Sequence, residues 1–335
     1  MLRLAVRYIV RSVLLIAVPV TVLIAAVFGG YFAVERYILK AEGPHKTDVF
    51  VTIAPGDGHS TVRWTLARAG VINELYHYDA ARIIKGRDFI PKEGEFKIPA
   101  KASLNETMRI IHFGQSHQRR LTVIEGIRSA QVIRQLDAVE FLIGDVSLDI
   151  PEGSVLPETY FYTQGTRRDD FIRRMQEKRQ ITLLEAWVNR QADLPFKAPE
   201  QALILASIIE LETADSADRR EVAGVFINRL RKGMRLQSDP TVLYGVDENP
   251  KRTILRSDLK RATDWNTYMI AGLPKTPICN PSADAVDAAL NPAETKNMYF
   301  VSDGKGGLRF ARTLDAHNKN VRLYRKFQRE AASGS

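Results

Sequence analysis

The stretch PEQALILASIIELET, residues 199–213, decides how the C-terminal part of this chain folds. On an α-helix its apolar residues cover nearly the whole circumference, and a helix that is apolar on all sides is a buried helix. Two acids, Glu210 and Glu212, interrupt it and lie about 200° apart on a helical wheel. Since they cannot share a face, at least one carboxylate must stand among apolar neighbours.

Glu210 is the deeper candidate, because it lies between Ile209 and Leu211 and one turn after Ala206. Desolvation disfavours the charged form of a carboxylate and raises its pKa, as a general acid near pH 7 requires. The alternative is a structural ion pair between Glu210 and a cation such as Arg229. The residues alone leave both interpretations open.

Irregular segments that could line a cleft follow this helix. The spacing predicts an amphipathic helix over residues 221–231, a turn at Ser238-Asp239-Pro240, and polar, aromatic loops at WNTYMIAGLP (265–274) and ICNPSADA (278–285). Aromatic side chains suit the apolar faces of sugar rings, and amide and hydroxyl groups supply directional partners. Beside a buried glutamate these loops favour a carbohydrate site, although each alone is equally typical of a well-capped turn.

The elements around this region mix helices with short strands, which predicts an α+β fold. Helices are expected over 105–113 and 129–136, with a strand at 120–124 between them, and a long basic helix over 169–191. Strands at 298–302 and 308–312 form a hairpin around DGKGG, and a last helix covers 314–329. The DGKGG loop lacks the spacing of a phosphate-binding loop and joins two strands.

Residues 12–34 carry no charge over 23 positions, enough for a helix to span a hydrocarbon core of roughly 30 Å. We therefore expect a single transmembrane helix. The preceding residues 1–11 contain three arginines and no acid, which places this tail in the cytoplasm and everything after the helix outside. A cleaved signal peptide is the alternative, but the apolar run exceeds its usual length of about 7 to 15 residues and no clear A-x-A site follows.

Outside the membrane, residues 35–48 read as a polar linker and residues 49–99 as a small βααβ subdomain. The opening of that subdomain, VTIAPGDGHSTVRWTLARAGVI, resembles the start of a LysM module, a fold that binds glycan chains. A spacer without a ligand is the alternative. Residues 100–331 form the main domain, with its core at 150–325, and residues 332–335 form a tail.

The amino-acid composition restricts the kinds of partner and cofactor that this protein can bind. The chain has 335 residues, which favours about two domains, and 48 Lys and Arg against 39 Asp and Glu give a net charge of +9, which favours an anionic partner. The single cysteine, Cys279, excludes a disulfide framework, and no Cys/His cluster has metal-ligand spacing. We therefore expect no metal and no cofactor. An external location and the lack of a binding motif argue against nucleic acid.

Several long stretches resemble the MltG (YceG-like) family of membrane-anchored endolytic murein transglycosylases. They are LASIIELET, VAGVFINRLRKGMRLQSDPTVLYG, NTYMIAGLP, YFVSDGKGG and the more distant PEGSVLPETY at 151–160. The resemblance implies a mixed α/β catalytic domain, anchorage in the cytoplasmic (inner) membrane and cleavage within new peptidoglycan strands. It also implies association with penicillin-binding synthases. Three positions depart from the family pattern: Glu158 replaces Asp, Trp265 replaces Tyr, and Pro274-Lys275-Thr276 replaces Pro-Pro-Gly.

By this resemblance Glu210 is the catalytic glutamate. It would protonate the glycosidic oxygen between MurNAc and GlcNAc, and its carboxylate would then accept the proton of the C6 hydroxyl that closes a 1,6-anhydro ring. The residues proposed to orient the sugars or shape the cleft are Gln237, Asp239, Asn266, Tyr268 and Asn280, with Glu158 and Tyr160.

Two alternatives remain open. A peptidoglycan hydrolase needs a second carboxylate, which Asp239 or Glu158 would supply. A non-catalytic, membrane-anchored glycan-binding or scaffold protein would hold Glu210 in a structural ion pair.

Overall fold

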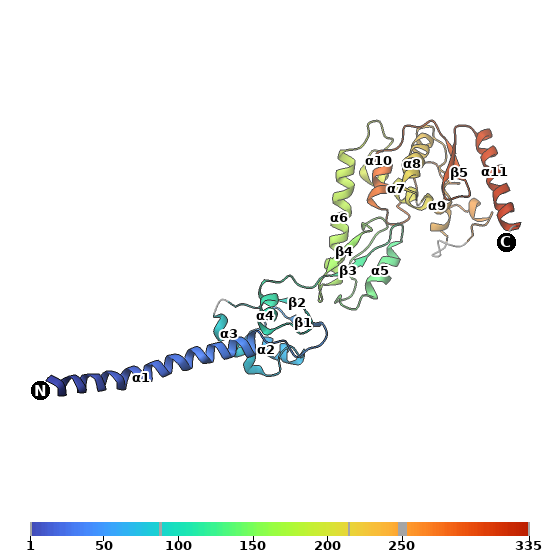
Figure 1. Cartoon of the computed structure of the whole chain (residues 1–335). Helices are drawn as coiled ribbons and strands as arrows, with labels where there is room; N and C mark the ends of the chain where they lie inside the picture. The colour runs from blue at the N-terminus through green and yellow to red at the C-terminus, as the bar shows by residue number, and fades with distance from the viewer. Residues whose placement is uncertain (1, 87–88, 214, 247–252, 334–335) are drawn as a thin grey trace. The chain divides into compact units, whose positions relative to one another are not determined.

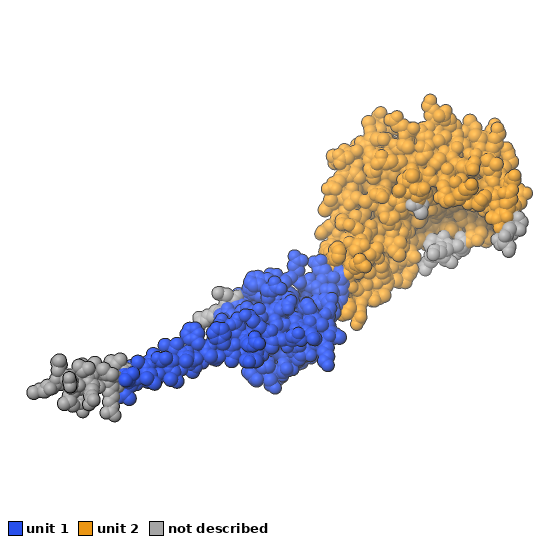
Figure 2. Space-filling model, in the orientation of Figure 1, with its two compact units in different colours: residues 1–119 blue, residues 120–335 orange. Residues whose placement is uncertain are grey.

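The computed structural model describes residues 2–86, 89–213, 215–246 and 253–333, and only the backbone for residues 2–13 and 332–333. The chain divides into two compact units, residues 1–119 and residues 120–335 (Figure 2). We describe each unit by itself.

The chain begins with helix α1 (Leu2–Val34), which continues as one π-helical segment, η1 (Glu35–Leu39). Residues 14–39 are long and apolar enough to cross a membrane, and large side chains such as Leu15, Ile16 and Phe32 are between 64% and 70% exposed. Exposed apolar surface on this scale is costly in water. The helix is therefore consistent with the expected single-pass anchor.

The first unit has the expected order of strand, two helices and strand. Strands β1 (Val49–Ile53) and β2 (Gly94–Ile98) pair antiparallel, with Val51 opposite Phe96, and helices α2 (His59–Arg68) and α3 (Leu75–Lys85) lie between them in sequence (Figure 1). The likeness to a LysM module stays a prediction.

Helix α4 (Leu104–Phe113) belongs to the first unit. Its residues Leu104, Met108 and Ile111 are buried in the same core as Val51 and Phe96. The boundary between the units consequently falls near residue 119, later than the expected boundary at 99/100, because the apolar face of α4 needs this core.

The second unit opens with a layer formed by two paired strands and two helices. Strands β3 (Arg119–Thr122) and β4 (Thr159–Tyr162) form a two-stranded sheet, accompanied by α5 (Ser129–Asp137) and the long α6 (Arg168–Val188). Buried residues of α5, β4 and α6 contribute to one apolar core, and the partly buried Leu121 of β3 packs against it.

Helix α7 (Pro199–Glu212) is the centre of the second unit, as the all-round apolar pattern predicts. It packs against α8 (Ser216–Arg231) and, most extensively, α10 (Ala283–Leu290) (Figure 1). Its residues Leu205, Ala206, Ile208 and Ile209 are completely buried.

Two segments predicted as loops contain short helices. Helix α9 (Asp239–Tyr244) starts at the predicted turn, with Pro240 in its first turn, and α10 follows the predicted 278–285 loop, with Ser282 as its N-cap. Between them lies a 3-10 turn, η2 (Asp258–Lys260). The predictions were wrong here because Pro and Ser also begin helices.

The predicted hairpin and last helix complete the unit. Strands β5 (Tyr299–Ser302) and β6 (Leu308–Ala311) pair antiparallel, and α11 (Leu314–Ser333) packs against both. Phe300 of β5 makes an edge contact with Phe226 of α8, which fixes the hairpin to the central helices.

Candidate active site

Glu210 is fully engaged by other protein groups. One carboxylate oxygen lies 3.2 Å from Nη2 of Arg219, and the other accepts hydrogen bonds from the backbone N–H of Ser282 at 2.8 Å and from its hydroxyl at 2.5 Å. The side chains of Glu210 and Arg219 are only 4% and 8% exposed. Arg219 also reaches Glu125 at 3.3 Å and Asp284 at 3.6 Å. This network joins α7, α8 and the start of α10.

The ion pair predicted as the alternative role of Glu210 therefore exists, but with Arg219 rather than Arg229. Glu210 is absent from the linings of the cavities described below. Glu210 is therefore held by Arg219 and Ser282 and lines neither cavity.

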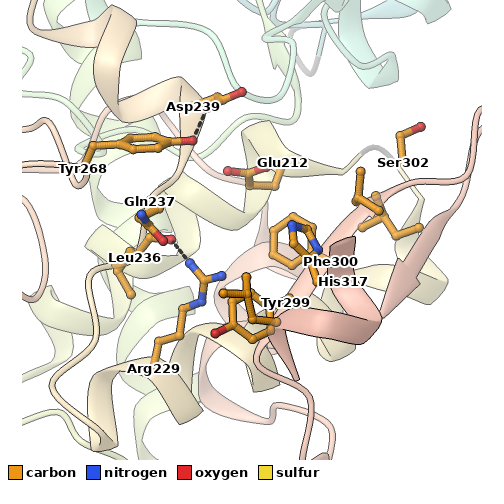
Figure 3. A pocket seen from close by; sticks show the side chains of 13 residues that line it. Glu212, Arg229, Leu236, Gln237, Asp239, Tyr268, Tyr299, Phe300, Ser302 and His317 are labelled. Atoms are coloured by element: carbon orange, nitrogen blue, oxygen red, sulfur yellow. Dashed lines mark hydrogen bonds between the residues drawn. The ribbon is translucent and has the colours of Figure 1, made fainter. Parts of the chain in front are cut away.

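Glu212, at the last position of α7, lies where two cavities meet. We call the first, of about 420 Å³, the hairpin-side cavity; its lining comprises Glu212, Arg229, Leu236, Gln237, Asp239, Tyr268, Tyr299, Phe300, Val301, Ser302, Leu308, Leu314 and His317 (Figure 3). The second, of about 500 Å³, is the α5-side cavity; its lining comprises Gly126, Ile127, Arg128, Gln131, Leu211, Glu212, Asp239, Pro240, Leu243, Tyr244, Ile254 and Ile278. Glu212 and Asp239 line both.

Burial raises the pKa of Glu212 to about 7. A hydrogen bond from the hydroxyl of Ser238, 2.5 Å from Oε1, opposes the shift, the charge of Asp239 adds to it, and the charge of Arg229 opposes it. A carboxyl group with this pKa is partly protonated at neutral pH, so it can both give and accept a proton.

Asp239 has a different environment from Glu212. Its Oδ1 accepts a hydrogen bond of 2.7 Å from the hydroxyl of Tyr268. Burial and the carboxylate of Asp239 both raise the pKa of Tyr268, which keeps the phenol protonated as the donor. The neighbouring Gln237 has a left-handed backbone, with φ of 51°, and its N–H donates to the carbonyl of Thr267. Gln237, Asp239 and Tyr268 thus line the hairpin-side cavity, and their expected contacts with sugar stay a prediction.

Asn266 and Asn280 are buried and bind backbone instead of lining a cavity. The amide of Asn266 donates to the carbonyls of Asp258 and Arg261, at 3.1 and 2.7 Å. Asn280 accepts from the N–H of Val155 at 3.2 Å and donates to the carbonyl of Ile127 at 3.1 Å. Both side chains organise the segments that carry the cavity walls.

Glu158 and Tyr160 also lie outside both cavity linings. Glu158 is exposed and forms an ion pair with Lys178. Tyr160 is 5% exposed, belongs to the core below β4 and donates its hydroxyl proton to the carbonyl of Leu156 at 2.7 Å. Within the described residues, no group of three His, Cys, Asp or Glu side chains could hold a metal ion.

Sequence reasoning gave no site role to Glu212, Ser238, Tyr244, Arg229 or His317, all of which contribute to this region. The helical wheel already separated Glu212 from Glu210, so one acid had to lie on each side of α7. The sequence does not show the position of Arg219, which lies on the next helix and forms an ion pair with Glu210.

Comparison with known proteins identifies the family of this chain. The chain belongs to the YceG-like family, whose model matches residues 51–323. The endolytic murein transglycosylase of Bacillus subtilis (strain 168) is 29% identical over 332 residues, which cover 89% of this chain and 91% of that protein.

Two further relatives extend the comparison. An endolytic murein transglycosylase of Streptococcus pneumoniae serotype 2 (strain D39) is 25% identical over 88% of this chain and 62% of its own length. A crystal structure of a YceG-like protein from Listeria monocytogenes superposes with a TM-score of 0.50 at 26% identity and covers 82% of this chain and 99% of that one. The expected family is confirmed.

Proposed function

We propose that this protein is a membrane-anchored endolytic murein transglycosylase in which Glu212 acts first as acid and then as base. The observation that carries the proposal is a carboxyl group with a pKa of about 7 at the junction of two cavities. The names of the relatives from Bacillus subtilis and Streptococcus pneumoniae supply the substrate class. This proposal moves the acid from Glu210, the sequence expectation, to Glu212.

In this mechanism protonated Glu212 gives its proton to the glycosidic oxygen between MurNAc and GlcNAc. The C–O bond breaks, and positive charge develops at C1 of MurNAc. The carboxylate of Glu212 then accepts the proton of the C6 hydroxyl of the same sugar, whose oxygen bonds to C1 and closes the 1,6-anhydro ring. Because the nucleophile is part of the substrate, a second carboxylate is unnecessary, unlike in most glycoside hydrolases.

The two cavities support cleavage within a strand. Glu212 and Asp239 line both, so sugars can occupy positions on either side of the acid. In the α5-side cavity the guanidinium of Arg128 lies 4.9 Å from the ring centre of Tyr244, which offers an aromatic wall of the kind that packs on sugars. A strand can therefore pass Glu212 without presenting an end.

For the membrane anchor we propose the orientation that the sequence predicts. We propose that α1 spans the cytoplasmic (inner) membrane with its N-terminus in the cytoplasm, so that the rest of the first unit and the whole second unit lie outside, facing the wall. Membrane lipid, murein strands and penicillin-binding synthases are the proposed partners. A reporter fused after Ser335 tests the orientation, because a cytoplasmic signal would contradict it.

The decisive experiment compares Glu212→Gln with Glu210→Gln in the full-length protein, with strand cleavage followed by mass analysis. Glu212→Gln should lower turnover by about a thousandfold, within the usual range for a lost general acid. Glu210→Gln should retain activity where it remains folded. The reverse result would return the role to Glu210.

The same products separate the alternatives. Anhydro ends are lighter than reducing ends by one water, so reducing ends alone would support a hydrolase that uses Asp239. Strand binding without cleavage by the folded wild type would support an anchored glycan-binding protein.

A further inference from the structure

Arg229, Tyr299 and His317 form one end of the hairpin-side cavity. Arg229 has a hydrogen-bond donor there that the other described residues do not use. Arg229 is 7% exposed. Its Nε donates to the carbonyl of Met298 at 2.7 Å, and its Nη1 donates to the carbonyl of Leu236 at 2.6 Å. Nη2 makes no hydrogen bond with any residue that the structure describes, and no described carboxylate lies within 4.0 Å of the guanidinium. The charge of Glu212 acts on Arg229 without a direct contact, so an anion that reaches Nη2 gains a charge-assisted hydrogen bond.

His317 adds a second unused polar group to the same end. Its Nδ1 is buried and, within the described part of the chain, has no hydrogen-bond partner. The ring stacks on Tyr299, with ring centres 5.2 Å apart, and the guanidinium carbon of Arg229 lies 5.2 Å from the centre of the same tyrosine ring. Arg229 and His317 thus both pack against Tyr299 and both line the cavity (Figure 3).

The charges within the cavity are separated. Asp239 is hydrogen-bonded to Tyr268 at the opposite end, with Glu212 between the two ends (Figure 3). A ligand with a negative group is attracted to the corner of Arg229 and repelled from the end of Asp239. The cavity therefore has a positive end and a negative end. This charge distribution would not help to bind an uncharged sugar.

We infer that the corner of Arg229, His317 and Tyr299 binds a carboxylate of the peptide that murein carries on its glycan strand. This inference rests on the proposed function and names a feature of its substrate. The sugar rings of such a strand are uncharged, because the lactyl acid of MurNAc is consumed in the amide to the peptide. The free carboxylates therefore belong to the peptide, and the enzyme should prefer strands whose peptide carboxyl groups are free over strands whose peptide carboxyl groups are amidated.

The first test compares full-length wild type on peptide-bearing strands and on the same strands after chemical amidation of the peptide carboxyl groups, because removing the peptide with an amidase would restore the lactyl carboxylate of MurNAc. One charge-assisted hydrogen bond corresponds to about ten- to hundredfold in kcat/KM, and we expect that preference for the strands with free carboxylates. Equal cleavage of both substrates would overturn the inference while leaving the proposed function intact. Cleavage of neither would contradict the proposed function itself.

Variants test which side chains cause the preference for free peptide carboxylates. His317→Phe keeps the ring stack and removes Nδ1, and Arg229→Lys keeps the charge but loses the forked donors. Each should reduce several-fold the ratio of kcat/KM between strands with free and strands with amidated peptide carboxyl groups. Arg231→Gln removes a charge from the same helix at an exposed side chain outside the cavity, and should preserve the preference. Because Arg229 also holds backbone carbonyls, its variant may be used only where circular dichroism matches wild type; otherwise His317→Phe decides.

A binding measurement is independent of catalysis. Free stem peptide should bind wild type, the same peptide with its carboxyl groups amidated should bind at least about tenfold more weakly, and His317→Phe should narrow that difference. Equal binding of the two peptides to wild type would overturn the inference.

Discussion

The hydroxyl of Ser238 lies 2.5 Å from Oε1 of Glu212, a hydrogen bond that joins the N-cap of α9 to the last residue of α7. Ser238 is itself fixed, because its N–H donates to the hydroxyl of Thr267 at 2.9 Å. The carboxyl group thus has a set orientation at the junction of the two cavities, although α7 ends there.

This hydrogen bond gives a prediction for pH dependence. Glu212 must be protonated to act as the acid, so wild-type activity should fall as the pH rises through about 7. The Ser238 hydrogen bond favours the charged form and lowers the pKa. Ser238→Ala should therefore move the alkaline limb of the kcat/KM profile to higher pH. A limb that stays in place or moves to lower pH would contradict this assignment.

The same carboxyl group predicts a pH-dependent stability difference. Burial raises the pKa of folded Glu212 to about 7 from an ordinary value of 4.5, so wild type has its full stability below pH 4.5 and loses part of it as the pH rises through 7. Glu212→Gln does not titrate. The stability of the variant relative to wild type should therefore increase between these pH values, by up to about 3 kcal/mol.

Thermal or denaturant unfolding of the full-length proteins in detergent at several pH values measures this difference. Glu200→Gln, a change at the first turn of the same helix, is the matched control and should give a constant offset. A flat difference for Glu212→Gln would show that its carboxyl group is solvated.

The helical pattern of residues 199–213 was sufficient to predict a buried helix that carries two acids on different faces, and the structure has both features. The pattern could not show which of the two acids faces a cavity. Burial next to Ile209 made Glu210 the deeper candidate. The partner of Glu210, however, comes from α8, and the hairpin-side cavity at Glu212 is lined by Arg229 and by residues from Leu236 onward. Contacts between segments distant in the sequence decide the environment of each carboxylate.

Asn266 and Asn280 show the same limit. Polar residues in predicted loops suggested sugar contacts, whereas in the structure their side chains satisfy buried backbone groups. Buried backbone polar groups need partners, and an asparagine amide supplies both a donor and an acceptor. Gln237, Asp239 and Tyr268 came from the same type of pattern and do reach the cavity, so composition alone does not separate the two outcomes.

Breaking the ion pair of Glu210 should lower the stability of the protein without removing the proposed catalytic acid, Glu212. Glu210→Gln leaves Arg219 without its nearest buried counter-ion and weakens the contact with Ser282, so the free energy of unfolding should fall by about 1 to 3 kcal/mol. Arg219→Met in the Glu210→Gln background should cost less than the two single changes together, because each residue compensates the other. Additive losses would mean that the pair is not coupled. Chemical denaturation of the four full-length proteins measures the cycle.

Asn280 provides the last prediction, since it connects Ile127 of the α5-side cavity to the buried core at Val155 without contacting substrate in our proposal. Its side chain binds Val155, Ile127 and Ser129, and Asn280→Ala would leave the N–H of Val155 buried without this acceptor. We expect a loss of about 2 to 4 kcal/mol in unfolding free energy, and kcat/KM per folded molecule within about threefold of wild type. Asn189→Ala, which removes an exposed asparagine that donates to the carbonyl of Glu185, is the matched control and should cost less than about 1 kcal/mol. If Asn280→Ala instead kept its stability and raised KM strongly, Asn280 would contact the sugar, as the sequence first suggested.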